Sequence, residues 1–141
     1  MGLVPALEWL GEEMNRLYRL DVTVIDDSNA KPLDERIRIV LFRAVRELLV
    51  NIAKHAGVHR AHVQIRRKGN QVTITVVDHG VGFDPKVVHD PKKTRGFGLF
   101  NIRERLDYLG GRMEIQSTIG KKTTITLRMP VVMEGQRVSE A

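Results

Sequence analysis

Residues 72–82 read VTITVVDHGVG, in which apolar and polar side chains alternate up to an acidic residue. Val72, Ile74 and Val76 are spaced by two, which is the period of a half-buried β-strand. A second alternating run covers residues 61–67, and a Lys-Gly-Asn triplet separates the two runs. The pattern predicts a β-hairpin around which the chain is organised.

Asp78 stands where the second of these strands ends, and Gly80 and Gly82 follow it. Glycine adopts positive φ angles and lets a ligand approach the main chain closely. A carboxylate at such a turn can accept a hydrogen bond from a ligand's amino group. Asp-x-Gly is also an ordinary turn sequence, so these residues alone leave a binding site and a simple turn both open.

Helical spacing of apolar residues predicts a first helix over residues 3–20, with Leu17 in its buried stripe. Asp34 is expected to cap a second helix that runs to about Ala56, where Gly57 stops it. The other expected elements are a strand at 21–26, a mobile loop at 83–95, a helix at 98–109, paired strands at 112–116 and 123–129, and a frayed tail at 131–141.

This order of elements predicts an α+β fold in one domain. Hairpin connections favour a mixed, mainly antiparallel sheet, with about three helices gathered on one face as a two-layer sandwich. The 141 residues suffice for one sizeable core, and 42% hydrophobic and 28% charged residues are ordinary for a globular protein. The absence of cysteine excludes disulfides, thiolate metal sites and cysteine nucleophiles. We expect no membrane span and no signal peptide.

The net charge of +6 raises the question of a nucleic-acid partner. The basic clusters at 66–68, 92–95 and 121–122 are short, scattered and not interleaved with aromatic residues. Solvated turns explain most of them, and the group at 92–95 also suits a smaller anion such as a nucleotide triphosphate. No nucleic-acid partner is therefore expected.

The second expected helix carries a polar ridge. Glu47, Asn51 and His55 are four residues apart, and Lys54 lies beside Asn51. Hard divalent ions such as Mg²⁺ prefer oxygen ligands together with waters and substrate phosphates, which Asn51 could help to supply. The alternative interpretation of this ridge is a solvated polar face.

A glycine-rich segment, Gly96-Phe97-Gly98-Leu99, directly precedes the third expected helix. The free N–H groups and positive dipole end of a helix N-terminus suit a phosphate group. The segment matches neither the Rossmann nor the P-loop pattern, and a hinge with a helix cap explains it equally well.

In combination, three motifs resemble one family. Glu-x-x-x-Asn followed by Lys-His, then Asp-x-Gly-x-Gly, then Gly-x-Gly-Leu before a helix is similar to the ATP-binding catalytic domain of sensor histidine kinases. That domain shares its Bergerat-type ATP-binding fold with DNA gyrase, heat-shock chaperone and mismatch-repair ATPases, the GHKL group. Residues 51–56 and 98–105 resemble most the nitrate-sensor and membrane-fluidity-sensor branch. The resemblance covers about residues 20–130.

At the base end of the nucleotide, the resemblance implies that Asp78 binds the adenine amino group. Gly80 and Gly82 would let the base and ribose lie against the chain. Thr123 or Thr124, on the last strand, would add a contact near the adenine.

At the phosphate end, the resemblance implies that Asn51 coordinates Mg²⁺. Glu47 would be the catalytic residue, holding the water shell of the metal or assisting proton movement, and Lys54 and His55 would face the phosphates. The remaining implied positions are the lid hinge at Gly96 and Gly98 and the phosphate-binding amides near Leu99.

The resemblance implies ATP and Mg²⁺ as cofactors and transfer of the γ-phosphate to a histidine on a separate dimerisation domain, with a response regulator as an indirect partner. None of the histidines stands in an acceptor motif, so little transfer is expected from this chain alone, and residues 1–19 would be the remnant of a linker. The chain would be a cytoplasmic monomer, and its parent a homodimer that can also carry a membrane anchor. An anti-sigma-type serine kinase of the same fold and a basic, non-enzymatic binding module are the alternatives.

Overall fold

A computed structural model describes residues 2–84, 86 and 94–131, with the backbone alone described at 94–97. Within this part of the chain the structure is an α+β fold with three helices and a mixed five-stranded sheet, as the sequence predicted. Its elements are α1 (Leu3–Tyr18), β1 (Asp21–Asp26), α2 (Glu35–His55), β2 (Arg60–Lys68), β3 (Gln71–Asp78), α3 (Thr94–Tyr108), β4 (Arg112–Gln116) and β5 (Thr123–Pro130).

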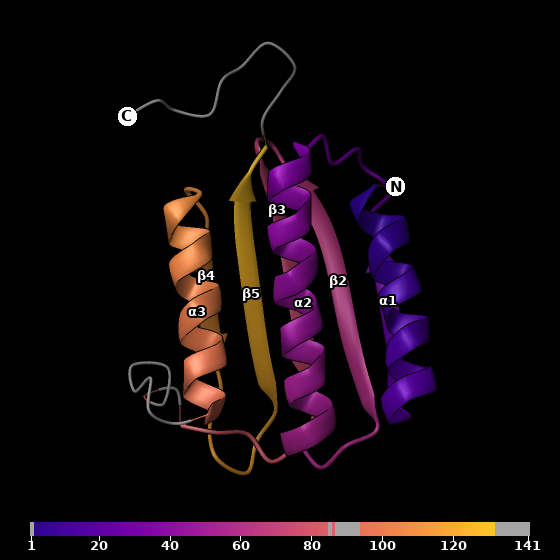
Figure 1. The fold of residues 1–141 in the computed structure, drawn as a ribbon, viewed down its shortest axis with the longest axis vertical. Coiled ribbons are helices and arrows are strands. Elements are labelled where there is room, and N and C mark those ends of the chain that lie inside the picture. The colour runs from indigo at the N-terminus through magenta and orange to yellow at the C-terminus, as the bar shows by residue number, and fades with distance from the viewer. Residues whose placement is uncertain (1, 85, 87–93, 132–141) are drawn as a thin grey trace.

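The sheet has the strand order β1-β2-β3-β5-β4, and all three helices cover the same face (Figure 1). β1 pairs with β2 in parallel, because α2 carries the chain back across the sheet between them. The other neighbours are antiparallel, including the predicted hairpin of β2 and β3, in which Lys68 pairs with Gln71. In Figure 1, α2 lies between α1 and α3 over the centre of the sheet.

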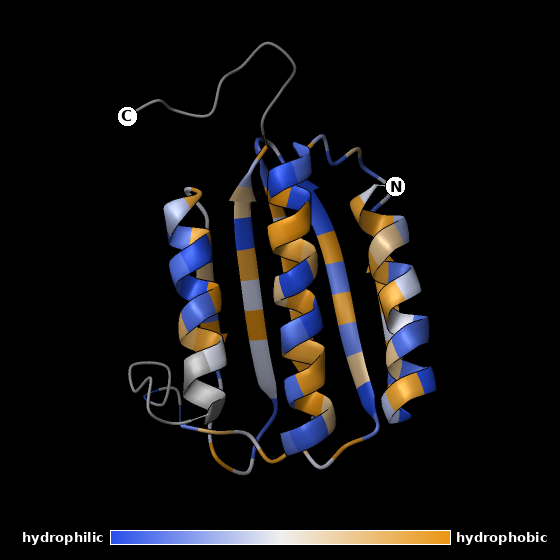
Figure 2. Ribbon diagram, in the orientation of Figure 1, coloured by the Kyte–Doolittle hydropathy of each residue, from blue (hydrophilic) through white to orange (hydrophobic). Residues whose placement is uncertain are grey.

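The strand pattern decides which side chains enter the core. Hydrophobic and polar residues alternate along β2, which appears as orange and blue bands in Figure 2. In β3 the same alternation directs Val72, Ile74, Val76 and Asp78 toward the helices, where each is at most 2% exposed. The core therefore lies between the sheet and the helices, and the end of β3 brings a carboxylate into it.

The second helix begins and ends as its sequence predicts. The Asp34 side chain accepts a hydrogen bond from the Ile37 N–H at 2.9 Å, which satisfies one of the free donors of the first turn. Gly57 follows the C-cap with φ +73°, a conformation that favours glycine. The cap at Asp34 and the glycine at position 57 therefore set where α2 begins and ends, and so which of its side chains face the sheet.

The first helix packs into the same core through Leu3, Leu7, Leu10 and Met14. The prediction for Leu17 was wrong, since this residue is 56% exposed. It lies in the last turn, just before the chain leaves the helix through the left-handed residue Arg19, so the apolar stripe continues past the buried contact.

The prediction for the third helix was wrong at its start. The helix begins at Thr94, four residues before Gly98, so Gly96 and Gly98 lie inside it. Glycines usually weaken a helix, which is why the sequence suggested a turn here. The expected mobile loop at 83–95 falls mostly on residues outside the described part, as does the expected frayed tail.

The link from β1 to α2 is closed by charged groups. The Lys31 ammonium donates to the side chains of Asp26 and Asp27 and, at 2.7 Å, to the Asn29 carbonyl. Asp27 also accepts from the Arg67 backbone N–H at 2.8 Å, which attaches the link to β2. The hydrogen bond from Lys31 is the largest of the effects that hold the pKa of Asp27 well below its usual range.

Among the described residues, none of the helices has both the length and the apolar character that a membrane span needs.

Candidate functional site

The carboxyl ends of two neighbouring strands bring Asp78 and Thr123 together. They are directly opposite in the β3–β5 register, and each is 2% exposed. By the exposure of the whole residue, they are the buried polar or charged residues in the described part of the chain. One oxygen of Asp78 accepts a hydrogen bond from the Gly80 N–H at 2.9 Å. A buried carboxylate and hydroxyl at the same level of a sheet form a polar end to an otherwise apolar core.

The register also separates the two threonines that the sequence could not separate. Thr123 faces the helices, and its hydroxyl lies 2.7 Å from the Ser117 hydroxyl. Ser117 in turn accepts from the Phe83 N–H at 2.9 Å. Thr124 is half-buried and points to the opposite face of the sheet, since successive strand residues alternate. Thr123 is therefore the threonine beside Asp78, and the sequence reading missed its partner Ser117.

A small cavity joins these strand ends to the helices. Four predicted site residues line it together, one from each of α2, β3, α3 and β5: Asn51, Asp78, Leu99 and Thr123. The apolar walls, which the sequence reading did not assign to a site, are Leu48, Ile52, Val76, Phe83 and Ile125.

The Asn51 side chain carries an unused hydrogen-bond donor. Its amide nitrogen is buried and has no hydrogen-bond partner among the described residues. Leaving a buried donor unpaired costs about 1–3 kcal/mol, so such groups are usually explained by a bound partner or a functional role. The cavity itself measures about 10 Å³, the space of roughly one water molecule. A larger ligand enters only if apolar wall residues such as Leu99 and Phe83 shift.

Two predicted glycines have structural reasons of their own. A Cβ at Gly80 would lie 2.4 Å from the Ala56 carbonyl oxygen, at the end of α2. A Cβ at Gly82, where φ is +67°, would lie 2.0 Å from the Thr118 carbonyl oxygen in the β4–β5 connection. The segment after Asp78 thus lies against backbone on both sides, which fixes the direction in which the carboxylate points.

The remaining residues of the polar ridge lie along α2. Glu47 is half-buried, whereas Lys54 and His55 are exposed in the last turn. Gly98 of α3 packs against Glu47, since a Cβ at position 98 would be 2.9 Å from Glu47 Oε1. The structure therefore keeps Glu47 next to Asn51 on one helix and places Gly98 directly over it.

The available oxygen donors fit Mg²⁺ in the form in which it usually binds substrate phosphates. Asn51 offers an amide oxygen and Glu47 a carboxylate, while no group of three or more His, Cys, Asp or Glu in the described ranges could hold a metal by itself. Mg²⁺ usually takes only one or two protein ligands and completes its shell with waters and phosphates. The donor set fits that pattern.

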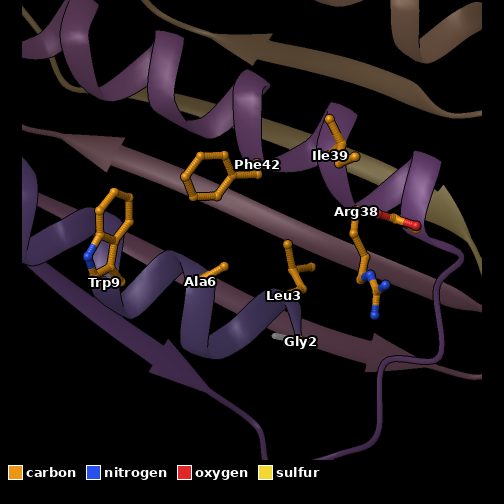
Figure 3. A pocket seen from close by; sticks show the side chains of 8 residues that line it. Gly2, Leu3, Ala6, Trp9, Arg38, Ile39 and Phe42 are labelled. Atoms are coloured by element: carbon orange, nitrogen blue, oxygen red, sulfur yellow. The ribbon is translucent and has the colours of Figure 1, made fainter.

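Two larger grooves lie on the outer surface of the helices. One, of about 510 Å³, runs between α2 and α3 beside Glu47 and Gly98. The other, of about 480 Å³, is mainly apolar and runs between α1 and α2 (Figure 3). In it, the rings of Trp9 and Phe42 stack with their centroids 6.3 Å apart. Neither groove shares a lining residue with the small cavity.

Residues 36–133 match the model of a family described as histidine kinase-, DNA gyrase B- and HSP90-like ATPase. Among curated proteins, the oxygen sensor histidine kinase NreB of Staphylococcus carnosus is 34% identical over 93% of this chain and 37% of its own length. The signal transduction histidine-protein kinase/phosphatase DegS of Bacillus subtilis is 31% identical over 93% of this chain and 34% of its own length. The chain spans about a third of the length of both relatives.

Solved structures show the same fold. The histidine kinase domain of the blue-light activated histidine kinase from Erythrobacter litoralis EL346 superposes with a TM-score of 0.71 at 20% identity, covering 93% of this chain and 62% of that one. Full-length ShkA in complex with AMPPNP gives a TM-score of 0.79 at 16% identity, covering 93% of this chain and 30% of ShkA. These likenesses establish the arrangement of the elements.

Proposed function

Because this chain belongs to the histidine kinase-, DNA gyrase B- and HSP90-like ATPase family, we propose that it binds ATP with Mg²⁺ and supplies the γ-phosphate to a histidine on a separate dimerisation domain. The observation that carries the proposal is the convergence of Asn51, Asp78 and Thr123 on one cavity, with the Asn51 nitrogen buried and unpaired. The similarity to NreB and DegS, both named histidine kinases, supports the choice of histidine as acceptor.

At the base end, Asp78 accepts a hydrogen bond from the adenine amino group. Because Asp78 is buried, this bond makes binding selective for a base with an amino group. A base that left the carboxylate unpaired, or repelled it, would lose far more binding free energy in a dry site than in water. Thr123 adds a hydroxyl beside it, held by Ser117. Gly80 and Gly82 keep the following backbone close enough to line the base and ribose.

At the phosphate end, the Asn51 oxygen is the metal ligand. Bound Mg²⁺ would neutralise phosphate charge, which is most of what phosphoryl transfer asks of a protein. Glu47 orients a water or takes up the proton of the acceptor, and the missing side chain at Gly98 leaves room for its carboxylate. Lys54 and His55 at the end of α2 face the phosphates, and Gly96, Gly98 and the amide of Leu99 belong to the part of α3 that closes over them.

The proposal extends to the parent protein. It would be a homodimer that carries the acceptor histidine and passes the phosphate on to a response regulator. A cytoplasmic location, where ATP is available, belongs to the same proposal.

The first test is the melting temperature of the chain with Mg²⁺ and either ATP or GTP. ATP should raise it more than GTP, because Asp78 accepts from an amino group where guanine presents a carbonyl. Asp78→Asn should weaken ATP binding about tenfold or more, whereas Asp107→Asn, at an exposed position of α3, should bind as the wild type does. Equal ATP shifts in Asp78→Asn and wild type would contradict the role of Asp78.

The second test identifies the acceptor. With the parent's dimerisation domain added, the phosphate should be acid-labile, as a phosphohistidine is. An acid-stable product would indicate serine and the anti-sigma type of kinase instead.

A further inference from the structure

The groove between α2 and α3 is lined by several positively charged side chains. It holds about 510 Å³ and opens beside Glu47, outside the small cavity. Three of its lining residues are arginines, and Glu47 is the one carboxylate among them. The lining residues are Phe42, Arg43, Arg46, Glu47, Gly98, Asn101, Ile102 and Arg105.

The three arginines come from both walls of the groove. Arg43 and Arg46 are three residues apart on α2, and Arg105 is in the last turn of α3. All three are exposed, and no ion pair involves them within the part of the chain that the structure describes. Like charges held around one groove repel one another, and an anionic partner relieves that repulsion. Guanidinium groups pair with carboxylates through two parallel hydrogen bonds.

The groove also has an apolar side. Ile102 lies in it, and Phe42 lines both this groove and the apolar groove toward α1. There the ring of Phe42 stacks on that of Trp9, a residue that is 50% exposed (Figure 3). A basic surface and an apolar surface therefore meet at Phe42. Together they are complementary to a helix that has one acidic and one apolar face.

We propose that the α2/α3 groove docks an acidic, amphipathic helix of the phosphoacceptor partner. The inference rests on the proposed function, since an acceptor histidine has to approach the phosphates next to Glu47, and the groove opens there. Carboxylates of the partner helix pair with Arg43, Arg46 and Arg105, and its apolar side chains contact Phe42 and Ile102. The arginines are positioning and specificity residues for the partner and take no part in holding the nucleotide.

The test uses Trp9, the single tryptophan of the chain, as a fluorescent reporter next to Phe42. The probe is a synthetic amphipathic helix of about 18 residues, free of tryptophan, with leucine on one face and glutamate on the other. A matched peptide carries glutamine in place of every glutamate. The glutamate peptide should change the Trp9 emission, bind about tenfold or more tightly than the glutamine peptide, and weaken as salt is raised.

Charge reversal locates the binding site. Arg43→Glu with Arg46→Glu should weaken the glutamate peptide about tenfold or more, and Arg105→Glu, on the other helix, should do so independently. Arg36→Glu is the matched control, because Arg36 is exposed on α2 and does not line the groove. The proposal is overturned if the glutamate peptide does not bind, if the glutamine peptide binds equally well, or if Arg36→Glu has the same effect as the groove variants.

The same proteins are tested for a melting-temperature shift with the ATP analogue AMPPNP and Mg²⁺, which separates the two proposals. All arginine variants should keep the wild-type shift, and a lost shift would place the groove in the nucleotide site and overturn the docking role. A missing shift in the wild type would count against the proposed function itself. If the arginine variants bind the peptide as the wild type does and keep the AMPPNP-induced shift in melting temperature, the docking proposal is overturned and the proposed function is not.

Discussion

Gly98 of α3 lies so close to Glu47 of α2 that a Cβ at position 98 would be 2.9 Å from Glu47 Oε1. The neighbour is the end of a flexible side chain, so it can move aside at little cost. The contact therefore matters more for where the Glu47 carboxylate points than for the stability of the fold.

Gly98→Ala should separate stability from activity. Alanine stabilises a helix interior by up to about 1 kcal/mol relative to glycine, so the melting temperature should stay the same or rise. The displaced carboxylate should slow phosphoryl transfer to the dimerisation domain about tenfold or more. Gly11→Ala in α1 is the control, since its Cβ would make ordinary contacts with Val22 at 3.4 Å or more. Equal transfer rates in both variants would show that Glu47 does not depend on Gly98.

Thr123→Val should weaken both the fold and nucleotide binding. Valine keeps the shape but removes the hydroxyl that bonds Ser117, a loss of about 0.5–1.5 kcal/mol in the free energy of unfolding. Denaturant titration measures that loss, and the ATP-induced shift in melting temperature should shrink as well. Thr124→Val, on the opposite face of the sheet, should change neither. The assignment fails if the Thr124 variant is the one that binds ATP less well.

Gly82→Ala should be strongly destabilising. The residue has φ +67°, and an added Cβ would lie 2.0 Å from the Thr118 and 2.5 Å from the Lys121 carbonyl oxygens. Left-handed backbone and overpacking together should cost about 2–5 kcal/mol in the free energy of unfolding. Gly69→Ala shares the positive φ, at +59°, but has nothing within 4 Å of its Cβ. The difference in the free energy of unfolding between the two variants measures the contribution of the close contact at position 82. Equal losses of stability in both variants would mean that this contact is unimportant.

Lys31→Met should lower the melting temperature in a pH-dependent way. The pKa of Asp27 is held below its usual range, chiefly by the hydrogen bond from Lys31. A group whose folded pKa is depressed stabilises the fold above its unfolded pKa, about 4, and loses this effect as the pH falls. The difference in melting temperature between wild type and variant should therefore be largest at pH 7 and become smaller below about pH 4. Lys68→Met, at an exposed position, should show no such gap, and a gap that stays constant into acid would refute the role of the pair.

The sequence predicted the elements whose signals are local. Alternation placed the strands of the central hairpin, and Asp34 and Gly57 marked both ends of α2. The start of α3 was missed, because the benefit of glycine at position 98 comes from Glu47 on another helix, which no local propensity records. Leu17 was misplaced for a similar reason, since periodicity does not say where the buried contact of a helix ends.

The sequence named several residues that line the small cavity, but it did not predict how they are arranged. Three motifs gave Asn51, Asp78 and the glycines, but Thr123 and Thr124 could be separated only by the register between β3 and β5. Phe83 was assigned to a loop, and it does lie outside the helices and strands, but its burial in the wall of the cavity was not predicted. The arginine groove escaped notice, because Arg105 meets Arg43 and Arg46 only when α2 and α3 lie side by side.

The small volume of the cavity between Asn51, Asp78 and Thr123 has a consequence for affinity. A space of about 10 Å³ cannot receive an adenine ring, so under the proposed function ATP would bind only a conformation in which the wall residues have moved. The measured dissociation constant is then the intrinsic one divided by the fraction of molecules that are open. The proposal therefore implies that the packing of apolar side chains such as Leu99 and Phe83 affects the affinity for ATP as well as the polar groups Asp78 and Thr123 do.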